Sequence, residues 1–358
     1  MKALARYGKA FGGYRLIDVP IPEVGDEDIL VEVKAATICG ADMKHFRVDN
    51  GSDEFNSIRG HEFAGEIAKV GSKVTDWKVG QRVVSDNTGH VCGVCRACEQ
   101  ADFLVCENKT NVGLDNNRWG GGFTKYAIIP GEILRIHRHA IMEIPEAISY
   151  EEAAAVEPLC NSYKAVAEQT HLKPGEDVVI MGAGPLGLYA VQVAKSMGAT
   201  NIVLVGLEAD THTRFELGLK LGATHVVNGS SEDVVARCQE ICGKENLGVV
   251  IECSGANIAL KQAIEMVRPN AEIVRAGMGF QPLDFSINRI TEWNISIIGH
   301  MAYDSTTWRN VLRCVASGQY ATKPMITHHF GLSEWEKGFE AMAEKDAIKV
   351  VLTYDFDD

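Results

Sequence analysis

Short apolar segments alternate with Gly, Asp and Pro through the first 150 residues of the chain. Apolar or alternating runs occupy residues 29–36, 63–70, 82–85 and 123–129, and turn-forming residues separate them. Runs of this length and pattern are typical of β-strands. Several strands at this spacing predict a barrel or a sandwich, so we expect the chain to begin with a β-rich domain.

The pattern changes near residue 150. Residues 151–171 have a helical pattern, and a Pro-Gly turn at 174–175 precedes an apolar strand at 177–181. Strands then alternate with helices, which predicts βαβ units on a parallel sheet. The expected helices are 185–197, 211–221, 232–242 and 257–267, and the expected strands are 201–205, 225–227, 248–252 and 271–276. Two surface helices, 308–318 and 333–345, and a strand at 348–354 complete the pattern.

A glycine-rich loop follows the first strand of the parallel region. Gly182, Gly184 and Gly187 form a GxGxxG motif, with Pro185 and Leu186 between the last two glycines. Glycines let the backbone turn tightly and approach a pyrophosphate, which then meets the positive end of the next helix. The motif alone also fits a plain glycine turn. Its place directly between a strand and a helix predicts a dinucleotide site.

An acid that binds the adenosine ribose is expected about 20 residues after such a motif. The next strand ends at Gly206, where an Asp is common, so Glu208 is our candidate and Asp210 the second choice. Either acid also fits a solvated loop. The first cation after this strand is Arg214, so a 2′-phosphate has no obvious partner. We therefore predict NAD rather than NADP.

Four of the ten cysteines, Cys92, Cys95, Cys98 and Cys106, lie within 15 residues. Structural zinc takes four thiolates tetrahedrally, and short loops let the backbone wrap one ion. An iron–sulfur cluster also needs four thiolates, and buried free thiols are a third interpretation. Because the loop belongs to the β-rich domain and has no electron-transfer context, we predict structural zinc.

A second possible metal site is dispersed along the chain. Cys39 follows an apolar strand, His61 opens the next one in the segment GHEFAG, and Glu157 stands before the parallel region. One thiolate, one imidazole and one carboxylate would leave an open zinc position, which a catalytic site requires. Each residue alone fits a structural role. Together with the cysteine loop and the glycine motif, they predict a catalytic zinc.

Composition and charge exclude several classes of protein. The 358 residues carry 35 basic and 48 acidic side chains, for a formal charge of −13, and no Lys/Arg run appears. This balance argues against a nucleic-acid partner. No stretch of about 18 apolar residues suggests a membrane span, and the N-terminus lacks the apolar core of a secretory signal. Cysteines gathered in one cluster fit a reducing compartment, so we expect a cytoplasmic protein.

Taken together, these motifs resemble the zinc-dependent medium-chain dehydrogenases, and among them the polyol branch that includes sorbitol, butanediol and threonine dehydrogenases. GHEFAG, the four-cysteine loop, EPL and GAGPLG occur in the family order along nearly the whole chain. The resemblance implies an α/β protein with two domains. A GroES-like β-rich catalytic domain would comprise residues 1–155 with 300–358, and a Rossmann domain with a doubly wound parallel sheet residues 156–299. It also implies a symmetric homo-oligomer, a dimer or a tetramer.

The same resemblance assigns roles at the catalytic metal. Cys39 and His61 correspond to zinc ligands, and Glu62 corresponds to the third ligand of polyol relatives. Glu157 matches a glutamate that approaches the metal directly or through water. Asp42 matches a carboxylate that steadies the histidine ligand, as such partners commonly do.

Three positions depart from the family pattern. Ala41 stands where relatives often have a Ser or Thr that passes the substrate proton outward, and Lys44 occupies the place of a common histidine. Ala302 falls where the sorbitol enzymes have a polyol-binding Arg. The usual proton route is therefore altered, and Glu157, Glu62 or a water molecule is expected to replace it.

The implied activity is oxidation of a secondary alcohol of a small polyol to the ketose, with hydride transfer to NAD. Erythritol or threitol is the first expectation for the substrate. A threonine or butanediol dehydrogenase is one alternative, and an inactive zinc-stabilised dinucleotide-binding protein is the other. Further polar residues expected near the substrate are Asp86, Asn87, Asn161, His300 and Tyr303.

Overall fold

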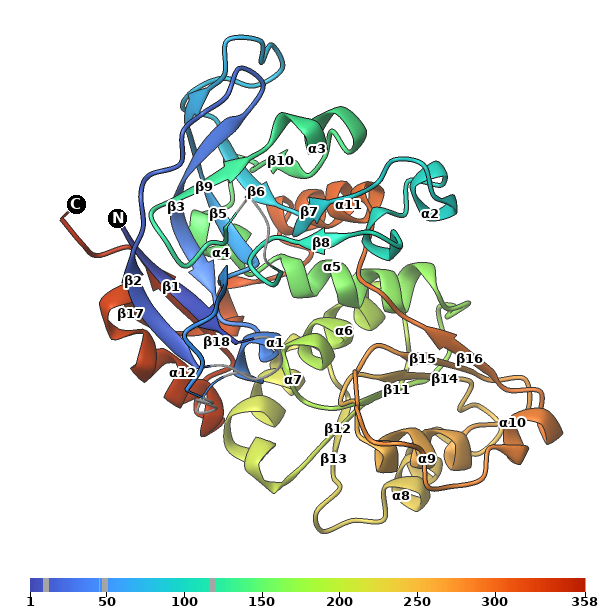
Figure 1. The fold of residues 1–358 in the computed structure, drawn as a ribbon. Helices are drawn as coiled ribbons and strands as arrows, with labels where there is room; N and C mark the ends of the chain where they lie inside the picture. Colours follow the sequence, from blue (N-terminus) through green and yellow to red (C-terminus); the bar gives the residue numbers. More distant parts are fainter. Residues whose placement is uncertain (9–12, 45, 47–50, 116–119, 358) are drawn as a thin grey trace. The chain divides into compact units, whose positions relative to one another are not determined.

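The computed structural model describes residues 1–8, 13–44, 46, 51–115 and 120–357 (Figure 1). The chain forms two compact units, one from residues 1–157 and 304–358 and the other from residues 158–303. We call them the first and the second unit. Within the described ranges, no helix has both the length and the apolar character needed to cross a membrane.

The first unit is built on mainly antiparallel sheets. Its strands are β1 (Lys2–Tyr7), β2 (Tyr14–Asp18), β3 (Ile29–Thr37), β4 (Phe55–Ile58), β5 (Glu62–Val70), β6 (Arg82–Ser85), β7 (Thr88–His90), β8 (Thr110–Asn111), β9 (Tyr126–Ile129), β10 (Ile141–Glu143), β17 (Ile326–Gly331) and β18 (Lys349–Thr353). The main sheet has the order β10-β6-β5-β3-β18-β17, in which β17 and β18 pair in parallel, and β9 also pairs with β3. Strands β2-β1-β4 and β7-β8 form two smaller sheets. Most residues of the central pair β3 and β5 are buried, and half-buried positions alternate with buried ones in part of each strand.

The C-terminal segment belongs to this main sheet. β18 pairs antiparallel with β3, so that Val351 lies opposite Thr37 and Leu352 opposite Ala36. The helices of the unit are α1 (Gly40–Met43), α2 (Arg96–Glu99), α3 (Gly131–Ile136), α4 (Tyr150–Ala154), α11 (Ser305–Ala316) and α12 (Trp335–Ala343). Phe339 of α12 packs against the rings of Tyr14 and Phe123. The end of the chain thereby completes the core of the first unit.

The second unit is a doubly wound parallel sheet. Its strands are β11 (Val178–Met181), β12 (Ile202–Gly206), β13 (His225–Asn228), β14 (Val249–Glu252), β15 (Glu272–Arg275) and β16 (Ser296–Gly299). The α-helices that follow β11 in this unit are α6 (Pro185–Ser196), α7 (Glu216–Leu221), α8 (Val234–Cys242), α9 (Asn257–Met266) and α10 (Asn288–Glu292). The strand order is β13-β12-β11-β14-β15-β16, and every pair is parallel. This is the order of the classical dinucleotide-binding sheet, and the predicted fold class is confirmed.

Alternate side chains of the strands face opposite layers of helices. Val179 and Val203 pack in one cluster with α8 and α9. On the other face, Leu204 lies against Gly218 of α7, and Ile180 lies against Gly187 of α6. Because both faces are covered, the strands are continuous apolar runs.

The expected helix 151–171 is interrupted. α4 begins with a capping box in which Ser149 and Glu152 exchange hydrogen bonds of 3.0 and 3.1 Å, and it ends at Ala154. A new helix, α5 (Glu157–Tyr163), then starts and continues as a π-helix over 164–168. Pro158 explains the break, because proline has no N–H to bond the carbonyl four residues earlier. That carbonyl, of Ala154, lies 3.5 Å from the Thr37 hydroxyl instead.

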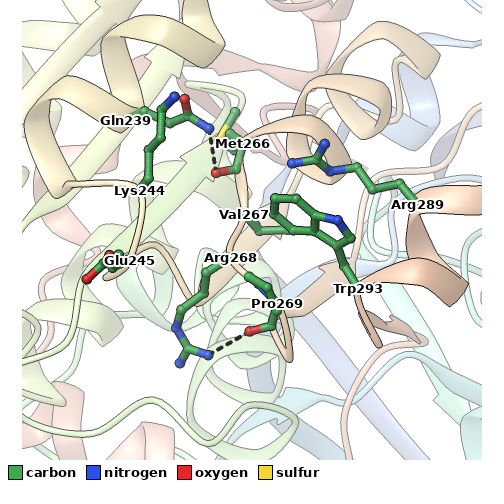
Figure 2. Close-up of a pocket in the computed structure, with 9 residues that line it drawn as sticks. All are labelled: Gln239, Lys244, Glu245, Met266, Val267, Arg268, Pro269, Arg289 and Trp293. Atoms are coloured by element: carbon green, nitrogen blue, oxygen red, sulfur yellow. Dashed lines mark hydrogen bonds between the residues drawn. The ribbon is translucent and has the colours of Figure 1, made fainter.

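A pocket of about 230 Å³ opens at the amino ends of β14, β15 and β16 (Figure 2). The Arg289 guanidinium stacks 3.6 Å from the centroid of the Trp293 ring in its wall. The glycine loop lies at the other, carboxyl end of the strands. The pocket is therefore separate from the edge at which doubly wound sheets bind ligands.

Candidate active site

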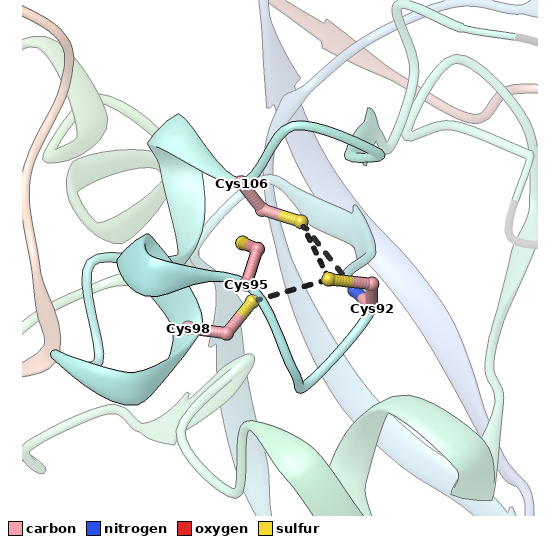
Figure 3. A group of neighbouring side chains, drawn as sticks. All are labelled: Cys92, Cys95, Cys98 and Cys106. Atoms are coloured by element: carbon pink, nitrogen blue, oxygen red, sulfur yellow. Dashed lines mark hydrogen bonds between the residues drawn. The ribbon is translucent and has the colours of Figure 1, made fainter.

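The four clustered cysteines meet in one loop of the first unit (Figure 3). Their Sγ atoms all lie within 4.8 Å of one another. The Sγ of Cys92 is 4.0 Å from that of Cys98 and 3.6 Å from that of Cys106. Four sulfurs at about 2.3 Å from a tetrahedral zinc would be about 3.8 Å apart. The arrangement therefore fits a structural zinc ion.

Backbone groups of this loop favour thiolates. Hydrogen bonds from the N–H groups of Val94 and Cys95 lower the pKa of Cys92 to about 6. The pKa of Cys95 is also lowered, first of all by the N–H of Cys98. Burial raises the pKa of Cys98 to about 12, so this thiol would lose its proton only when a cation binds its sulfur.

A second group of ligand atoms forms where β3 and β5 meet. One ligand atom each from Cys39, His61 and Glu62 lies within 4.8 Å of the others. The pairing of Thr37 with Glu62 in the sheet brings the two segments together. Gly60 precedes the histidine with a φ of +94°, and a Cβ there would lie 2.7 Å from Phe123. Only glycine meets both conditions without strain.

The buried polar atoms of this cluster fit a metal ion. His61 and Glu62 are 3% and 1% exposed. His61 Nδ1 and Glu62 Oε1 have no hydrogen-bond partner among the described residues. Burial and then the charge of Glu62 raise the pKa of Cys39 well above its usual value. Buried polar atoms without hydrogen-bond partners are costly. A cation bound by these sulfur, nitrogen and oxygen atoms would remove that cost. This set of ligand atoms suits zinc with one open position.

Lys349 at the start of β18 is a member of the site that sequence reasoning missed. It is 1% exposed, and its Nζ donates to Glu62 Oε2 and, at 3.3 Å, to the Ile38 carbonyl. The Thr37 hydroxyl donates to the same Glu62 oxygen. Burial lowers the pKa of Lys349, but the charges of Glu62 and Cys39 outweigh it and the net shift is upward. A lone lysine in the apolar run IKVVLTY was the signal in the sequence.

Asp42 is fully buried and makes contacts other than the expected one. Its Oδ2 accepts the Cys39 N–H at 3.1 Å, and its Oδ1 accepts from the Arg59 guanidinium at 3.1 Å. The distance from Asp42 Oδ2 to His61 Nδ1 is 3.9 Å, which exceeds a hydrogen bond. In this structure Asp42 fixes the backbone of Cys39 directly.

Glu157, the first residue of α5, stands apart from the three grouped ligands. It is 7% exposed, and its charge contributes to raising the pKa of both Cys39 and Lys349. It does not belong to the group of atoms within 4.8 Å that contains Glu62. Of the two candidate carboxylates, Glu62 is thus the one brought together with Cys39 and His61.

The five further polar residues expected near the substrate are all buried or half-buried. Asp86 forms a buried pair with His137. The Nδ1 of His300 lies 2.6 Å from the Gln169 side-chain oxygen, and its Nε2 lies 3.3 Å from that of Asn161. Burial lowers the pKa of His300 to about 4, so its ring is neutral near pH 7.

The glycine loop has the conformation that its motif predicts. Gly182 follows β11 with a φ of +110°, and a Cβ at Gly187 would collide with its carbonyl oxygen. Gly184 precedes α6, whose first residue is Pro185, and Leu186 follows. The loop lies at the carboxyl end of β11, beside β14, where the strand order reverses. Sheets of this class bind their ligands at that point.

The two candidate ribose acids have different surroundings. Glu208 is exposed, and its Oε2 accepts from Asn228 Nδ2 at 2.5 Å. Asp210 is buried, and its carboxylate accepts the Leu207 N–H at 2.9 Å and pairs with Arg214 at 3.0 Å.

The fold-back of Asp210 explains why β12 ends in Gly206. A Cβ at Gly206 would lie 3.0 Å from an oxygen of Asp210 and 2.6 Å from the Phe215 ring. The carboxylate of Asp210 therefore takes the space that a strand-ending side chain would need. Its pairing partner, Arg214, is 8% exposed.

Comparison with known proteins identifies the family. Residues 25–138 match the alcohol dehydrogenase GroES-like domain, and residues 185–317 match the zinc-binding dehydrogenase family. The chain is 70% identical to the uncharacterized zinc-type alcohol dehydrogenase-like protein YdjL of Escherichia coli K12, over 100% of both chains. The chain belongs to the zinc-dependent medium-chain alcohol dehydrogenase family. The dehydrogenase is also 32% identical to the sorbitol dehydrogenase of Halalkalibacterium halodurans, over 99% of each chain.

A solved structure agrees with this assignment. The 2R,3R-butanediol dehydrogenase of Bacillus subtilis matches with a TM-score of 0.85 and 26% identity, over 99% of each chain. The resemblance predicted from the motifs is thus confirmed, and so are the GroES-like and Rossmann folds. The dehydrogenase is an oxidoreductase that works with zinc and a nicotinamide dinucleotide.

Replacing Lys349 by Met should leave the Glu62 carboxylate buried without its cation. Removing one partner of a buried ion pair costs about 3–5 kcal/mol. We expect the urea midpoint of unfolding to fall clearly in K349M, and the additional change E62Q to restore part of the loss. The matched control is K337M, which breaks an exposed pair with Glu334 and should cost less than about 1 kcal/mol. Equal losses in the two single variants would contradict this reading of the ion pair.

Proposed function

We propose that this dehydrogenase oxidises a secondary alcohol of a small polyol, erythritol or threitol, to the ketose, with NAD as the hydride acceptor. The observation that carries the proposal is the buried cluster of Cys39, His61 and Glu62, whose polar atoms lack partners. The same chain carries a glycine loop at the strand-order reversal of a parallel sheet. The sorbitol and butanediol enzymes among its relatives support a small polyol as the substrate.

Two zinc ions are part of the proposal. Cys39, His61 and Glu62 would hold the catalytic ion, and Cys92, Cys95, Cys98 and Cys106 the structural one. A zinc ion in the first cluster supplies Lewis-acid chemistry, since it lowers the pKa of a hydroxyl group that it binds. Lys349 and the Thr37 hydroxyl restrain one oxygen of Glu62 and leave the other free to act as a ligand.

The substrate proton needs an acceptor other than residue 41, because alanine has no hydroxyl group. Glu157 is buried in this unit and close enough for its charge to affect Cys39. We propose that Glu157 takes the proton as the hydride leaves the carbon atom. Asp42 and Arg59 would act on the cluster by holding the Cys39 backbone in place.

The experiment that tests this function is reduction of NAD with a panel of alcohols by the purified enzyme. The panel comprises tetritols, pentitols and hexitols, together with 2,3-butanediol and L-threonine. We expect the highest kcat/KM with a tetritol. A higher value with threonine or butanediol would replace the polyol assignment. Zinc analysis of the same preparation should give about two ions per chain, whereas one ion and no activity with any alcohol would support an inactive dinucleotide-binding protein.

Glu208 is the residue that we propose to select NAD. A carboxylate there can accept hydrogen bonds from both ribose hydroxyls and repels a 2′-phosphate. E208A should raise the KM for NAD by roughly tenfold or more, on the scale of about 1–3 kcal/mol for hydrogen bonds to a charged group. The KM for NADP should barely change. If the kcat/KM of the wild type favours NADP tenfold, Arg214 rather than Glu208 determines the choice of cofactor.

We also propose a cytoplasmic homo-oligomer, a tetramer or a dimer. β16 is the last strand of the parallel sheet, and Ile297 on it is 37% exposed. An apolar strand edge of this kind is suited to pairing with a second copy. Light scattering should give a mass two or four times the 39.0 kDa of one chain. A monomeric mass would disprove this part of the proposal.

A further inference from the structure

Glu252 ends β14 at the carboxyl edge of the parallel sheet, and its side chain is fully buried. One oxygen, Oε1, accepts three hydrogen bonds from the following turn. They come from the Ser254 N–H at 2.7 Å, the Ser254 hydroxyl at 2.6 Å and the Gly255 N–H at 2.9 Å. The other oxygen, Oε2, is buried and has no hydrogen-bond partner among the described residues. Nothing in the zinc chemistry proposed above requires this acid.

A buried carboxylate at this place is costly, and the structure compensates it locally. Burial raises the pKa of Glu252, while the donors of the turn and the charge of Arg275 act against that shift. Arg275 is the residue directly opposite Glu252 on the neighbouring strand β15. Three donors of the turn converge on one oxygen of this side chain. The acid therefore holds its turn, residues 253–256, firmly in one conformation.

This turn is packed between two glycine-containing segments. On one side, the Cys253 N–H donates to the Met181 carbonyl at 2.9 Å. A Cβ on Gly182, the first glycine of the motif, would lie 3.2 Å from Ser254. Gly255 itself has a φ of +73°. The turn thus sets the position of the backbone at which the glycine motif begins.

On the other side, the turn touches the segment after β15, residues 276–279. The N–H groups of Ala276 and Gly277 both donate to the Glu252 carbonyl at 2.8 Å. A Cβ on Gly277 or Gly279 would collide with backbone atoms of Gly255. These contacts leave no room for side chains, so the spacing between the segments depends on the turn.

We propose that Glu252 is a positioning residue for dinucleotide binding. Its carboxylate fixes the turn 253–256 and through it the spacing of the glycine motif and the segment 276–279 along the carboxyl edge of β11, β14 and β15. The nucleotide binds at the point where the strand order reverses, between β11 and β14. Glu252 therefore acts through the backbone and does not itself need to touch the cofactor. This inference rests on the dinucleotide site of the proposed function.

The test compares three variants of Glu252 in the full-length enzyme by fluorescence titration with NADH. E252Q keeps an acceptor oxygen for the turn and should bind within about threefold of the wild type. E252D keeps the charge but withdraws the acceptor by one methylene group, and it should bind at least fivefold more weakly. E252A removes the acceptor, and its Kd should rise at least tenfold. The KM for the dinucleotide should follow the Kd, while kcat at saturation changes less than about threefold.

The matched control is E272A on the neighbouring strand. Glu272 begins β15 at the amino edge of the same sheet, and it also accepts a backbone N–H, that of His171, at 2.8 Å. Because it is remote from the glycine motif, E272A should bind NADH within about twofold of the wild type. Equal weakening in E272A and E252A would overturn the proposal in favour of general loosening of the sheet.

The remaining outcomes separate this inference from the proposed function. Wild-type affinity in E252A, or in E252D should E252A fail to fold, overturns the positioning role alone. Weaker binding by E252Q than by E252D overturns it too, because the charge would then matter more than the acceptor position. A wild type that binds neither NADH nor NADPH overturns both the inference and the dinucleotide site. A wild type that binds NADH but oxidises no polyol overturns only the substrate assignment.

Discussion

The ion pair between Lys349 and Glu62 is the contact on which the candidate metal site depends. It joins the last strand of the chain to residues 287 positions earlier, with both side chains almost completely removed from water. An unpaired carboxylate is expensive in such surroundings. The pairing of β18 with β3 is what delivers the ammonium group to this place. The C-terminal segment therefore contributes to the candidate metal site as well as to the core of the first unit.

The charges around this pair explain why the cluster suits a divalent cation. Glu62, Asp42 and Glu157 are buried acids, and the Cys39 thiol adds a fourth potential anion. Lys349 and Arg59 are the buried cations that contact them. The cations pair with Glu62 and Asp42, and loss of the Cys39 proton would add a further negative charge to the cluster. A zinc ion would balance that charge, and it would also supply a partner for the buried polar atoms of His61 and Glu62.

Most of the second unit and the four-cysteine loop could be predicted because their signals are local. Strands such as β11 and β14 are continuous apolar runs, and the cysteine loop places its ligands within 15 residues. The strand β17, by contrast, contains two adjacent histidines, and β1 carries Lys2 and Arg6 among its other residues, so neither has a clear alternating pattern. Lys349 and Arg59 were missed for a related reason. Their partners are distant in the sequence, and a single cation in an apolar strand does not indicate which acid it meets.

The ribose acid shows how packing can change the meaning of a motif. The sequence indicates only that Gly206 lacks the usual carboxylate and that two acids follow. In the structure Asp210 folds back beneath the strand end, and Arg214 neutralises it there. Glu208 keeps its charge at the surface, where an amide of Asn228 is its hydrogen-bond donor. An amide orients a carboxylate without cancelling its charge, so under our proposal Glu208 would repel a 2′-phosphate. The preference for NAD that we propose therefore has two sources. Asp210 pairs with Arg214, the first cation after the strand, and the exposed Glu208 carries the repelling charge.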